Sequence, residues 1–233
     1  MKIAIASRGL PRSGNIDLHA SFNSIHTYKP EAIAWCRENL DILKNTFSGH
    51  EITTFLCSWN MQNAVEFSSS FDYSSLPNEP TKEECFKFLP GQPILYSKPS
   101  HAYYGSTNAA KILIQTKEVM RLVRDSEQEF DYVIMTRPDI RIRLNNPDEW
   151  LTDKYVVPGY FYVDFNDHLG AAPAKEMLKT WDFTDEEMRE VVSRSNDNED
   201  VIKSLLQRSG LPFQTNRNMS EYTLRNNNGI IGG

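Results

Sequence analysis

Apolar and polar stretches alternate along this chain in a way that predicts strands interleaved with helices. Three apolar runs have the length and β-branched content of buried strands, at Lys2–Ala6, Glu51–Trp59 and Tyr132–Met135. Between them, Pro30–Phe47 and Asn108–Phe130 repeat apolar residues at helical spacing. An opening of strand, loop, helix and strand predicts a parallel crossover. We therefore expect a single α/β domain, an α/β/α sandwich with a mostly parallel central sheet.

The rest of the chain has a less regular pattern. Asn60–Leu89 is rich in Ser, Asn, Glu and Pro, which predicts irregular structure with one short helix at Thr81–Phe88. Residues 214–233 are polar and predict a C-terminal tail. Further strands are expected at Pro93–Ser97 and Tyr155–Phe165, and further helices at Pro173–Trp181 and Asp197–Ser209.

Composition excludes several classes of protein. The chain has 233 residues, a formal charge of −6 and no long basic run, so a general nucleic-acid binder is not expected. Its 3 cysteines match no zinc spacing, and an odd number argues against a disulfide framework. No apolar run reaches membrane-spanning length, and the first apolar stretch is too short for a signal peptide. We therefore expect a cytoplasmic protein without a membrane span.

The residues that follow the third strand are the first candidates for chemistry. Pro138 cannot donate to a strand ladder and should end the strand, which leaves Arg137 and Asp139 at its carboxyl end. Ligands bind at that edge in open α/β sheets. A carboxylate there suits a divalent metal that carries a diphosphate, whereas an Arg–Asp pair that pins a turn explains the same residues. Continued alternation would place Arg141 and Arg143 on the same face, where a solvated surface is the simpler interpretation.

Four motifs in order give the chain a resemblance to a known family. They are CSWN (Cys57–Asn60), YVIMTRPDI (Tyr132–Ile140), FNDHLGAAPAKEM (Phe165–Met177) and NEDVIKSLLQRSG (Asn198–Gly210). The series resembles the GT-A class of nucleotide-sugar glycosyltransferases, and in particular small glycosyltransferase-like domains of bacteria and large DNA viruses. The resemblance covers about residues 1 to 213.

The resemblance implies a metal site at Asp139, which stands where GT-A enzymes carry a DxD motif that binds Mn²⁺ or Mg²⁺. Here the motif reads Asp139-Ile140-Arg141, so its second acid is missing. A Mg²⁺ site can work with one carboxylate and substrate phosphates. Alternatively Arg137, Arg141 or Arg143 could replace the metal electrostatically.

The resemblance also implies a catalytic base at the start of the last predicted helix. Asn198-Glu199-Asp200 resembles the xED motif of inverting GT-A enzymes, in which a carboxylate takes the proton of the acceptor hydroxyl. We expect Asp200 to be this base, with Glu199 as the next candidate. Helix capping by Asp197 or Asn198 explains acids at this position equally simply.

The remaining site residues that the resemblance implies would contact the nucleotide-sugar donor. Asn166 and Asp167 could bond sugar hydroxyls, or could form a strand-ending turn and helix cap. Two arginines in the loop after the first strand could meet a diphosphate, and Trp59 suits packing better than stacking on a base. The expected donor-binding residues are Ser7, Arg8, Arg12, Trp59, Arg137, Asn166 and Asp167.

The implied function is transfer of a sugar from a nucleotide-sugar, a UDP-sugar by preference, to a hydroxyl acceptor on a glycan. The transfer would be metal-assisted and inverting. Two alternatives remain: a sugar-nucleotide nucleotidyltransferase of related fold, and a catalytically silent carbohydrate-binding domain. The missing second acid of the DxD motif favours the silent domain.

Overall fold

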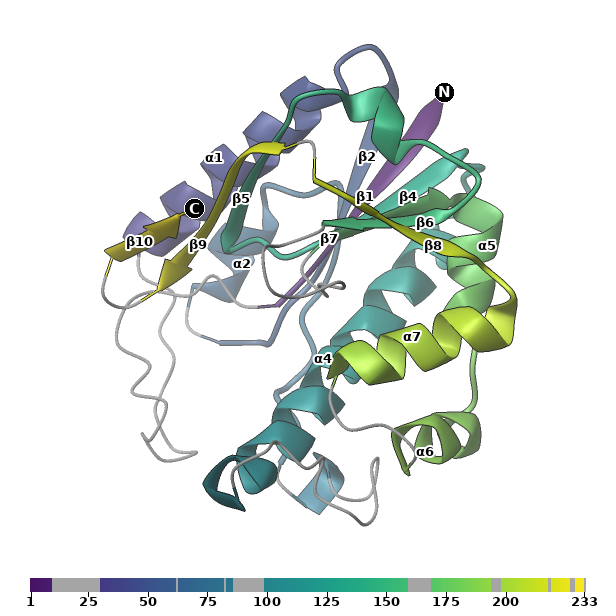
Figure 1. Cartoon of the computed structure of the whole chain (residues 1–233). Helices are drawn as coiled ribbons and strands as arrows, with labels where there is room; N and C mark the ends of the chain where they lie inside the picture. The colour runs from purple at the N-terminus through teal and green to yellow at the C-terminus, as the bar shows by residue number, and fades with distance from the viewer. Residues whose placement is uncertain are drawn as a thin grey trace.

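The computed structural model describes residues 1–9, 30–61, 63–81, 83–85, 99–158, 169–193, 198–217, 219–226 and 229–232. Strands and helices alternate along most of this chain (Figure 1). In chain order they are β1 (Lys2–Arg8), α1 (Pro30–Thr46), β2 (Glu51–Cys57), α2 (Ala64–Ser68), β3 (Tyr73–Ser75), α4 (Pro99–Asp125), β4 (Tyr132–Thr136), β5 (Ile140–Leu144), the 3-10 helix η1 (Pro147–Trp150), β6 (Tyr155–Pro158), β7 (Leu169–Pro173), α5 (Ala174–Thr180), α6 (Asp185–Ser193), α7 (Asn198–Ser209), β8 (Phe213–Asn216), β9 (Met219–Asn226) and β10 (Gly229–Gly232).

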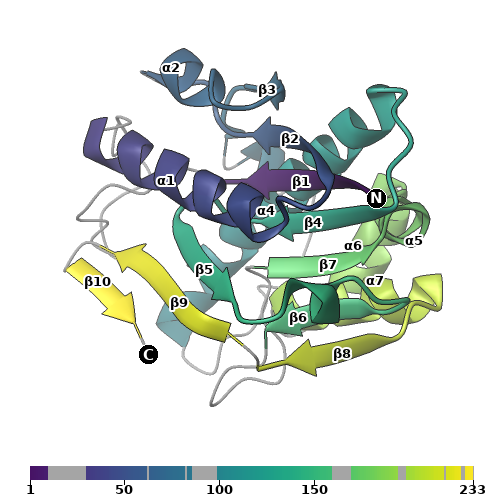
Figure 2. The same ribbon diagram turned by 90° about the horizontal axis from the view of Figure 1, so that it is seen from above.

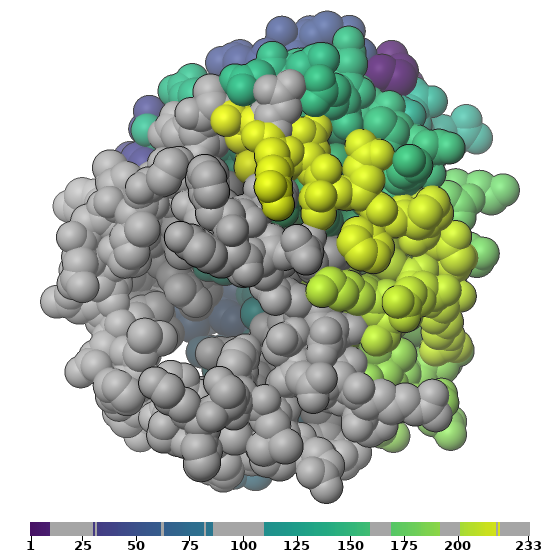
Figure 3. Space-filling model, viewed as in Figure 1, coloured from purple at the N-terminus to yellow at the C-terminus, as the bar shows by residue number. Residues whose placement is uncertain are grey.

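The central sheet has seven strands in the order β3-β2-β1-β4-β7-β6-β8. The pairs β3–β2, β2–β1, β1–β4 and β6–β8 are parallel, whereas β7 is antiparallel to both of its neighbours. The predicted mostly parallel sheet is therefore confirmed. Strand β8 forms one edge of the sheet and lies at the molecular surface (Figure 3).

Both faces of the sheet are covered, which is why its inner strands, such as β1, β4 and β6, are largely apolar rather than alternating with polar residues. Along β1, Ala4 and Ala6 pack into a core with residues of α4, α5, α6 and α7, whereas Ile3 and Ile5 pack into a second core with α1 and β5. Figure 2 shows the strands of the central sheet in their order, with β5, β9 and β10 together at one side. The predicted α/β/α arrangement is confirmed.

A second, three-stranded sheet corrects the expected polar tail. Strand β9 pairs antiparallel with both β5 and β10, and the order is β10-β9-β5. Residues 214–233 thus contain β9, β10 and most of β8 rather than a tail without structure. One of the two partners of β9, β5, lies far upstream, so the local composition of the C-terminal residues could not indicate that pairing.

Other elements differ from the prediction in extent or were not predicted. The region Asn60–Leu89 contains α2 and β3, both short, and residues 83–85 are helical. Helix α4 begins nine residues earlier than expected and ends five residues earlier. Strand β7 and helix α6 were not predicted. The strand expected at Pro93–Ser97 and the end of the one expected at Tyr155–Phe165 lie outside the described residues.

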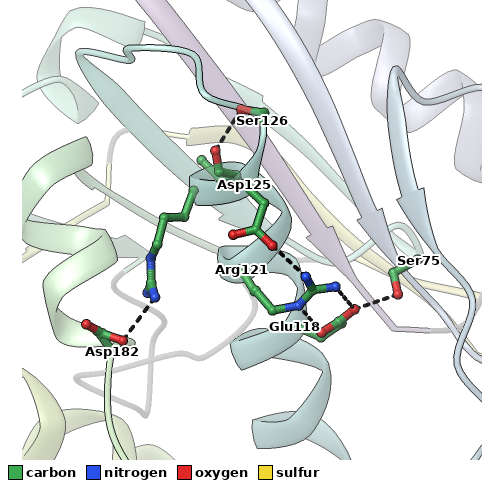
Figure 4. Close-up of polar contacts among 8 residues, drawn as sticks. Ser75, Glu118, Arg121, Asp125, Ser126 and Asp182 are labelled. Carbon is green, nitrogen blue, oxygen red and sulfur yellow. Dashed lines mark hydrogen bonds and ion pairs between the residues drawn. The ribbon is translucent and has the colours of Figure 1, made fainter.

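Helix α4 carries a group of ion pairs near β3. Arg121 donates from Nε to Glu118 Oε2 at 2.9 Å and from Nη2 to Oε1 at 2.8 Å, and its Nη1 donates to Asp125 at 2.5 Å. Ser75, the last residue of β3, donates from its hydroxyl to Glu118 at 2.7 Å (Figure 4). This group joins the edge strand to α4.

No helix of the described ranges is long and apolar enough to cross a membrane.

Candidate functional site

The carboxyl ends of β1, β2 and β4 meet at one edge of the central sheet. Ser7 of β1 lies beside Thr136 of β4, and Arg8 lies beside Cys57 of β2. The chain leaves β4 toward Arg137 from this edge. Three of the predicted site segments are therefore neighbours in space, as expected where parallel strands present their carboxyl ends to a ligand.

The strand ends before Pro138, as predicted, and the chain then forms a turn. Strand β4 stops at Thr136, and the amide of Ile140 donates to the carbonyl oxygen of Arg137 at 3.4 Å across the turn. The next residues form β5, which belongs to the second sheet. The expectation that the arginines up to Arg143 share one face with Asp139 is therefore wrong. Arg143 is exposed, as expected for a solvated position.

Within this turn Arg137 and Asp139 form a two-bond pair. Arg137 donates from Nε to Oδ1 of Asp139 at 2.9 Å and from Nη2 to Oδ2 at 2.7 Å. The side chain of Asp139 is 1% exposed and that of Arg137 is 13% exposed. Both carboxylate oxygens are thus engaged by one guanidinium in a nearly closed environment. Such charge-assisted pairs combine energy with a defined geometry.

Helix α1 holds the same turn from the other side. The amide of Asn39 donates from Nδ2 to the carbonyl oxygen of Pro138 at 3.1 Å, and its Oδ1 accepts from Nε of Arg141 at 3.1 Å. Arg141 also pairs with Glu38 at 2.5 Å, and its guanidinium lies 3.7 Å from the ring centroid of Trp35. Arg141 is only 13% exposed, so its expected solvated position is wrong.

Asn39 is a residue that sequence reasoning missed. It is 6% exposed although it is polar, and it lies on the same helical face as Trp35, four positions earlier. A polar residue inside an amphipathic helix is ordinarily assigned to the solvent face. The only sequence signal was its place among the apolar positions of α1.

Gly9 lies at the end of β1, among the ends of β1, β2 and β4 that together form one wall of the site. Its φ of +113° lies in a region that residues with a side chain rarely adopt. Its amide donates to the carbonyl oxygen of Cys57 at 3.1 Å, and its carbonyl oxygen accepts from the hydroxyl of Ser58 at 2.8 Å. A Cβ at this position would lie 3.9 Å from Cδ of Pro138. The ends of β1, β2 and β4 are therefore packed close together.

A small cavity lies between α1 and these strand ends. Ser7, Cys36, Asn39, Arg137 and Pro138 contribute to its lining. Its volume is about 10 Å³, which is room for about one water molecule. The cavity is therefore too small for a nucleotide.

Helix α7 begins at the same edge of the sheet. Strand β8 runs in the direction of β4, because β7 is antiparallel to both β4 and β6 and β8 is parallel to β6. Since α7 leads directly into β8, it runs back along the sheet from the carboxyl edge (Figure 1). This topology places the backbone of Glu199 and Asp200, in the first turn of α7, at that edge. Gly210, with φ +75°, follows the helix as predicted.

The other predicted site residues are placed as follows. Ser7, Arg8 and Trp59 are each 2% exposed, so all three belong to the wall beneath the site. The burial of Trp59 agrees with packing rather than base stacking. Arg12, Asn166 and Asp167 lie outside the described residues.

The described residues do not fit a divalent metal. No group of three or more His, Cys, Asp or Glu side chains in the described part of the chain could hold one. Asp139 is the described acid that follows β4 at this edge, and both of its oxygens accept hydrogen bonds from Arg137. A hard cation needs several oxygen ligands in a regular arrangement.

The three cysteines are buried packing residues. Cys36, Cys57 and Cys85 are buried and form no disulfide with one another. Burial, with a smaller contribution from Glu118, raises the pKa of the Cys57 thiol far above its usual range. The thiolate is the reactive form, so Cys57 is a packing residue.

No family model matches the chain, and no curated protein matches it. Solved structures that resemble it include a protein described as a candidate nucleotide-diphospho-sugar transferase from Desulfovibrio desulfuricans G20. That pair has a TM-score of 0.44 and 10% identity, over 93% of this chain and 79% of the other. The galactosyltransferase LgtC, in complex with donor and acceptor sugar analogues, gives a TM-score of 0.46 and 10% identity over 88% of this chain and 70% of its own. At these values, function has to be argued from the residues of this chain.

Proposed function

We propose that the protein is a glycosyltransferase that moves a sugar from a nucleotide-sugar, a UDP-sugar by preference, to a hydroxyl of a glycan acceptor. The observation that supports the proposal is that Arg8 and the Arg137–Asp139 turn lie at the carboxyl edge of the sheet, the edge from which the topology has α7 begin. Cations and a candidate base at a single edge are what this transfer requires. Arg12, Asn166 and Asp167 complete the donor-binding residues of the proposal.

The chemistry requires two kinds of group. As the bond between the sugar C1 and the diphosphate breaks, negative charge grows on the leaving oxygen, and fixed positive charges beside it stabilise the transition state. The acceptor hydroxyl must lose its proton as it attacks C1, and a carboxylate base typically contributes about 10²–10⁴-fold. Asp200 takes that role in our proposal, with Glu199 as the next candidate. Direct attack opposite the leaving group inverts the configuration at C1.

The metal role predicted for Asp139 enters no step of this proposal. Its two oxygens accept hydrogen bonds from Arg137, and no group of three or more metal-binding side chains lies among the described residues to complete a coordination shell. The positive charge opposite the diphosphate is assigned to arginine side chains.

Donor hydrolysis in the absence of an acceptor tests the proposal. The protein should be screened with UDP-, GDP-, CMP- and dTDP-sugars, and the melting temperature and the release of free nucleotide should be measured together. A ligand that binds the native state raises the melting temperature. An enzyme should also release nucleotide slowly. A nucleotide-sugar that raises the melting temperature but is neither hydrolysed nor transferred to a glycan would contradict the proposed enzymatic activity. It would support a catalytically silent binding domain.

Amide variants of the two acids test the base. Asp200→Asn should lower the transfer rate by about 10²-fold or more, with little change in donor affinity, because a base acts in the transition state. Glu199→Gln should be measured in parallel. Asp148→Asn is the matched control, because Asp148 is an exposed acid in η1, which precedes β6 and so lies at the opposite edge of the sheet. Unchanged rates in both α7 variants would mean that the acids only cap the helix.

A further inference from the structure

We infer that Arg137 is the resident cation of this site and that it binds the phosphate groups of a ligand without a divalent metal. In this inference Asp139 is a positioning residue that holds the guanidinium, and it is not a metal ligand. The inference rests on the proposed function for the identity of the ligand, a diphosphate. It does not rest on that function for the chemistry of binding.

The first support is the state of the Asp139 carboxylate. Bidentate binding of a metal to Asp139 would displace the guanidinium from both hydrogen bonds, at 2.9 Å and 2.7 Å, and the remaining lone pairs belong to a side chain that is only 1% exposed. Displacement would break two charge-assisted hydrogen bonds in a nearly closed environment, which carries a large free-energy cost. The metal would have to recover this cost with one carboxylate from the described residues.

The second support is the difference in exposure within the pair. Arg137 is 13% exposed, whereas Asp139 is 1% exposed. A ligand that approaches from solvent therefore meets the arginine, and the aspartate lies behind it. The opposite order would be expected if the carboxylate were there to coordinate a metal that carries the ligand.

The third support is the chemistry of the guanidinium. It is planar, always charged, and presents five N–H groups in a rigid fork that suits phosphate oxygens. The pairing with Asp139 uses Nε and Nη2 and so fixes the plane of the fork. The turn itself is fixed by Asn39 through the carbonyl oxygen of Pro138. A cation that is already oriented loses less freedom when it binds.

The local charge also favours an anion. Arg8 ends β1 one position beyond the pairing of Ser7 with Thr136, and Arg137 directly follows Thr136. Arg8, Arg137 and Asp139 together carry one net positive charge, although the whole chain has a formal charge of −6. A net positive site on a negative protein is a specific place for phosphate groups.

Inorganic pyrophosphate is the probe that tests this inference independently of any sugar or base. Calorimetric titration should be carried out in EDTA and again in Mg²⁺, on the parent protein. We expect measurable binding in EDTA, with an affinity that Mg²⁺ changes by no more than about twofold, since no metal site takes part. An affinity that appears only with Mg²⁺ would overturn the inference.

Three variants identify the residue responsible. Arg137→Lys keeps the charge but loses the fork, and should lower pyrophosphate affinity in EDTA by about tenfold or more. Arg143→Lys makes the same change at an exposed position of β5 and should leave the affinity unchanged. Asp139→Asn should weaken binding in EDTA by disturbing the orientation of Arg137, without creating a dependence on Mg²⁺. Melting temperatures must show that each variant is folded.

The outcomes separate the inference from the proposed function. No pyrophosphate binding in either buffer would mean that the pair only pins the turn, and Mg²⁺-dependent binding abolished by Asp139→Asn would make Asp139 a metal ligand. Both results overturn the inference. Release of nucleotide from a nucleotide-sugar, measured in the same two buffers, tests the function. Release of nucleotide only with Mg²⁺ would support the proposed function and overturn the inference. Pyrophosphate binding without metal, but with no release of nucleotide in either buffer, would support the inference and contradict the proposed function.

Discussion

Two arginines of this chain make the same paired hydrogen bonds to a carboxylate in very different surroundings. Arg121 bonds Glu118 at 2.9 Å and 2.8 Å on the surface of α4, and Arg137 bonds Asp139 at 2.9 Å and 2.7 Å in the turn after β4. The surface pair is 53% and 23% exposed, whereas the buried pair is 13% and 1% exposed. The distances are nearly equal, so any difference in energy must come from the environment.

The comparison teaches that geometry alone does not decide what an ion pair contributes. In solvent, water screens the charges and competes for the hydrogen bonds, and an exposed pair contributes about 0–1 kcal/mol. In a closed turn, each partner depends on the other, and loss of one partner costs about 3–5 kcal/mol. Loss of the buried pair should therefore lower the free energy of unfolding far more than loss of the surface pair. Four experiments can test this.

The largest expected effect is that of Arg137→Ala. The substitution leaves Asp139 buried without the guanidinium that satisfies its two oxygens, so the free energy of unfolding should fall by about 3–5 kcal/mol. Urea titration measures this change. If the urea midpoint stays at the parental value, the pair is effectively solvated and the comparison with Arg121 fails.

A smaller effect is expected from Asn39→Ala, which removes a neutral partner of the same turn. The carbonyl of Pro138 and Nε of Arg141 each lose one hydrogen bond, so destabilisation of about 1–3 kcal/mol is expected. Asn39→Asp keeps an acceptor for Arg141 and should lie between the parent and the alanine variant. Equal urea midpoints for Asn39→Ala and the parent would show that α1 does not hold the turn.

Arg121→Ala should have a smaller effect still. Its partners Glu118 and Asp125 can return to water, so the free energy of unfolding should fall by less than about 1 kcal/mol. A double-mutant cycle with Glu118→Ala isolates the pair, and the coupling should weaken as salt is added. A coupling as large as the effect of Arg137→Ala would mean that burial is not the deciding variable.

The smallest expected effect is a dependence on pH at the surface pair. Hydrogen bonding from Arg121, with a smaller contribution from Ser75, holds the pKa of Glu118 below its usual value of 4.5. A lowered pKa in the folded state gives stability that is present above the unfolded pKa and is lost as the pH falls through the folded pKa. The stability difference between the parent and Glu118→Gln should therefore shrink below about pH 4.5. A difference that does not shrink at all as the pH falls below 4.5 would assign the effect to packing.

The sequence predicted the elements whose pattern is local. Strands β1, β2 and β4 are apolar because both of their faces are buried, and α1 and α7 repeat apolar residues with a glycine just beyond their ends. The predicted ends of these strands also indicated the edge of the sheet at which the candidate site lies. These features depend on residues that are near one another in the chain.

The elements and roles that were missed depend on partners far away in the chain. Strand β9 is polar and is stabilised by pairing with β5, and β3 has only three residues and extends the sheet beside β2. For Asp139, the sequence left a metal ligand and an arginine partner as equal possibilities. Only the three-dimensional arrangement shows that its carboxylate faces Arg137 while the chain turns away into β5.

The pairing of β5 with β9 has a consequence for the order in which the molecule can be made. Ile140 pairs with Leu224, which is 84 residues later in the chain (224 − 140). At a synthesis rate of about 5–20 residues per second, the ribosome needs roughly 4–17 s to deliver that partner. During this interval β1, β2 and β4 can already associate, but the strand that leaves the Arg137–Asp139 turn has an open edge. Strand β5, next to the site, is therefore paired only late, and its open edge at that stage is where a chaperone, or another nascent copy, would act.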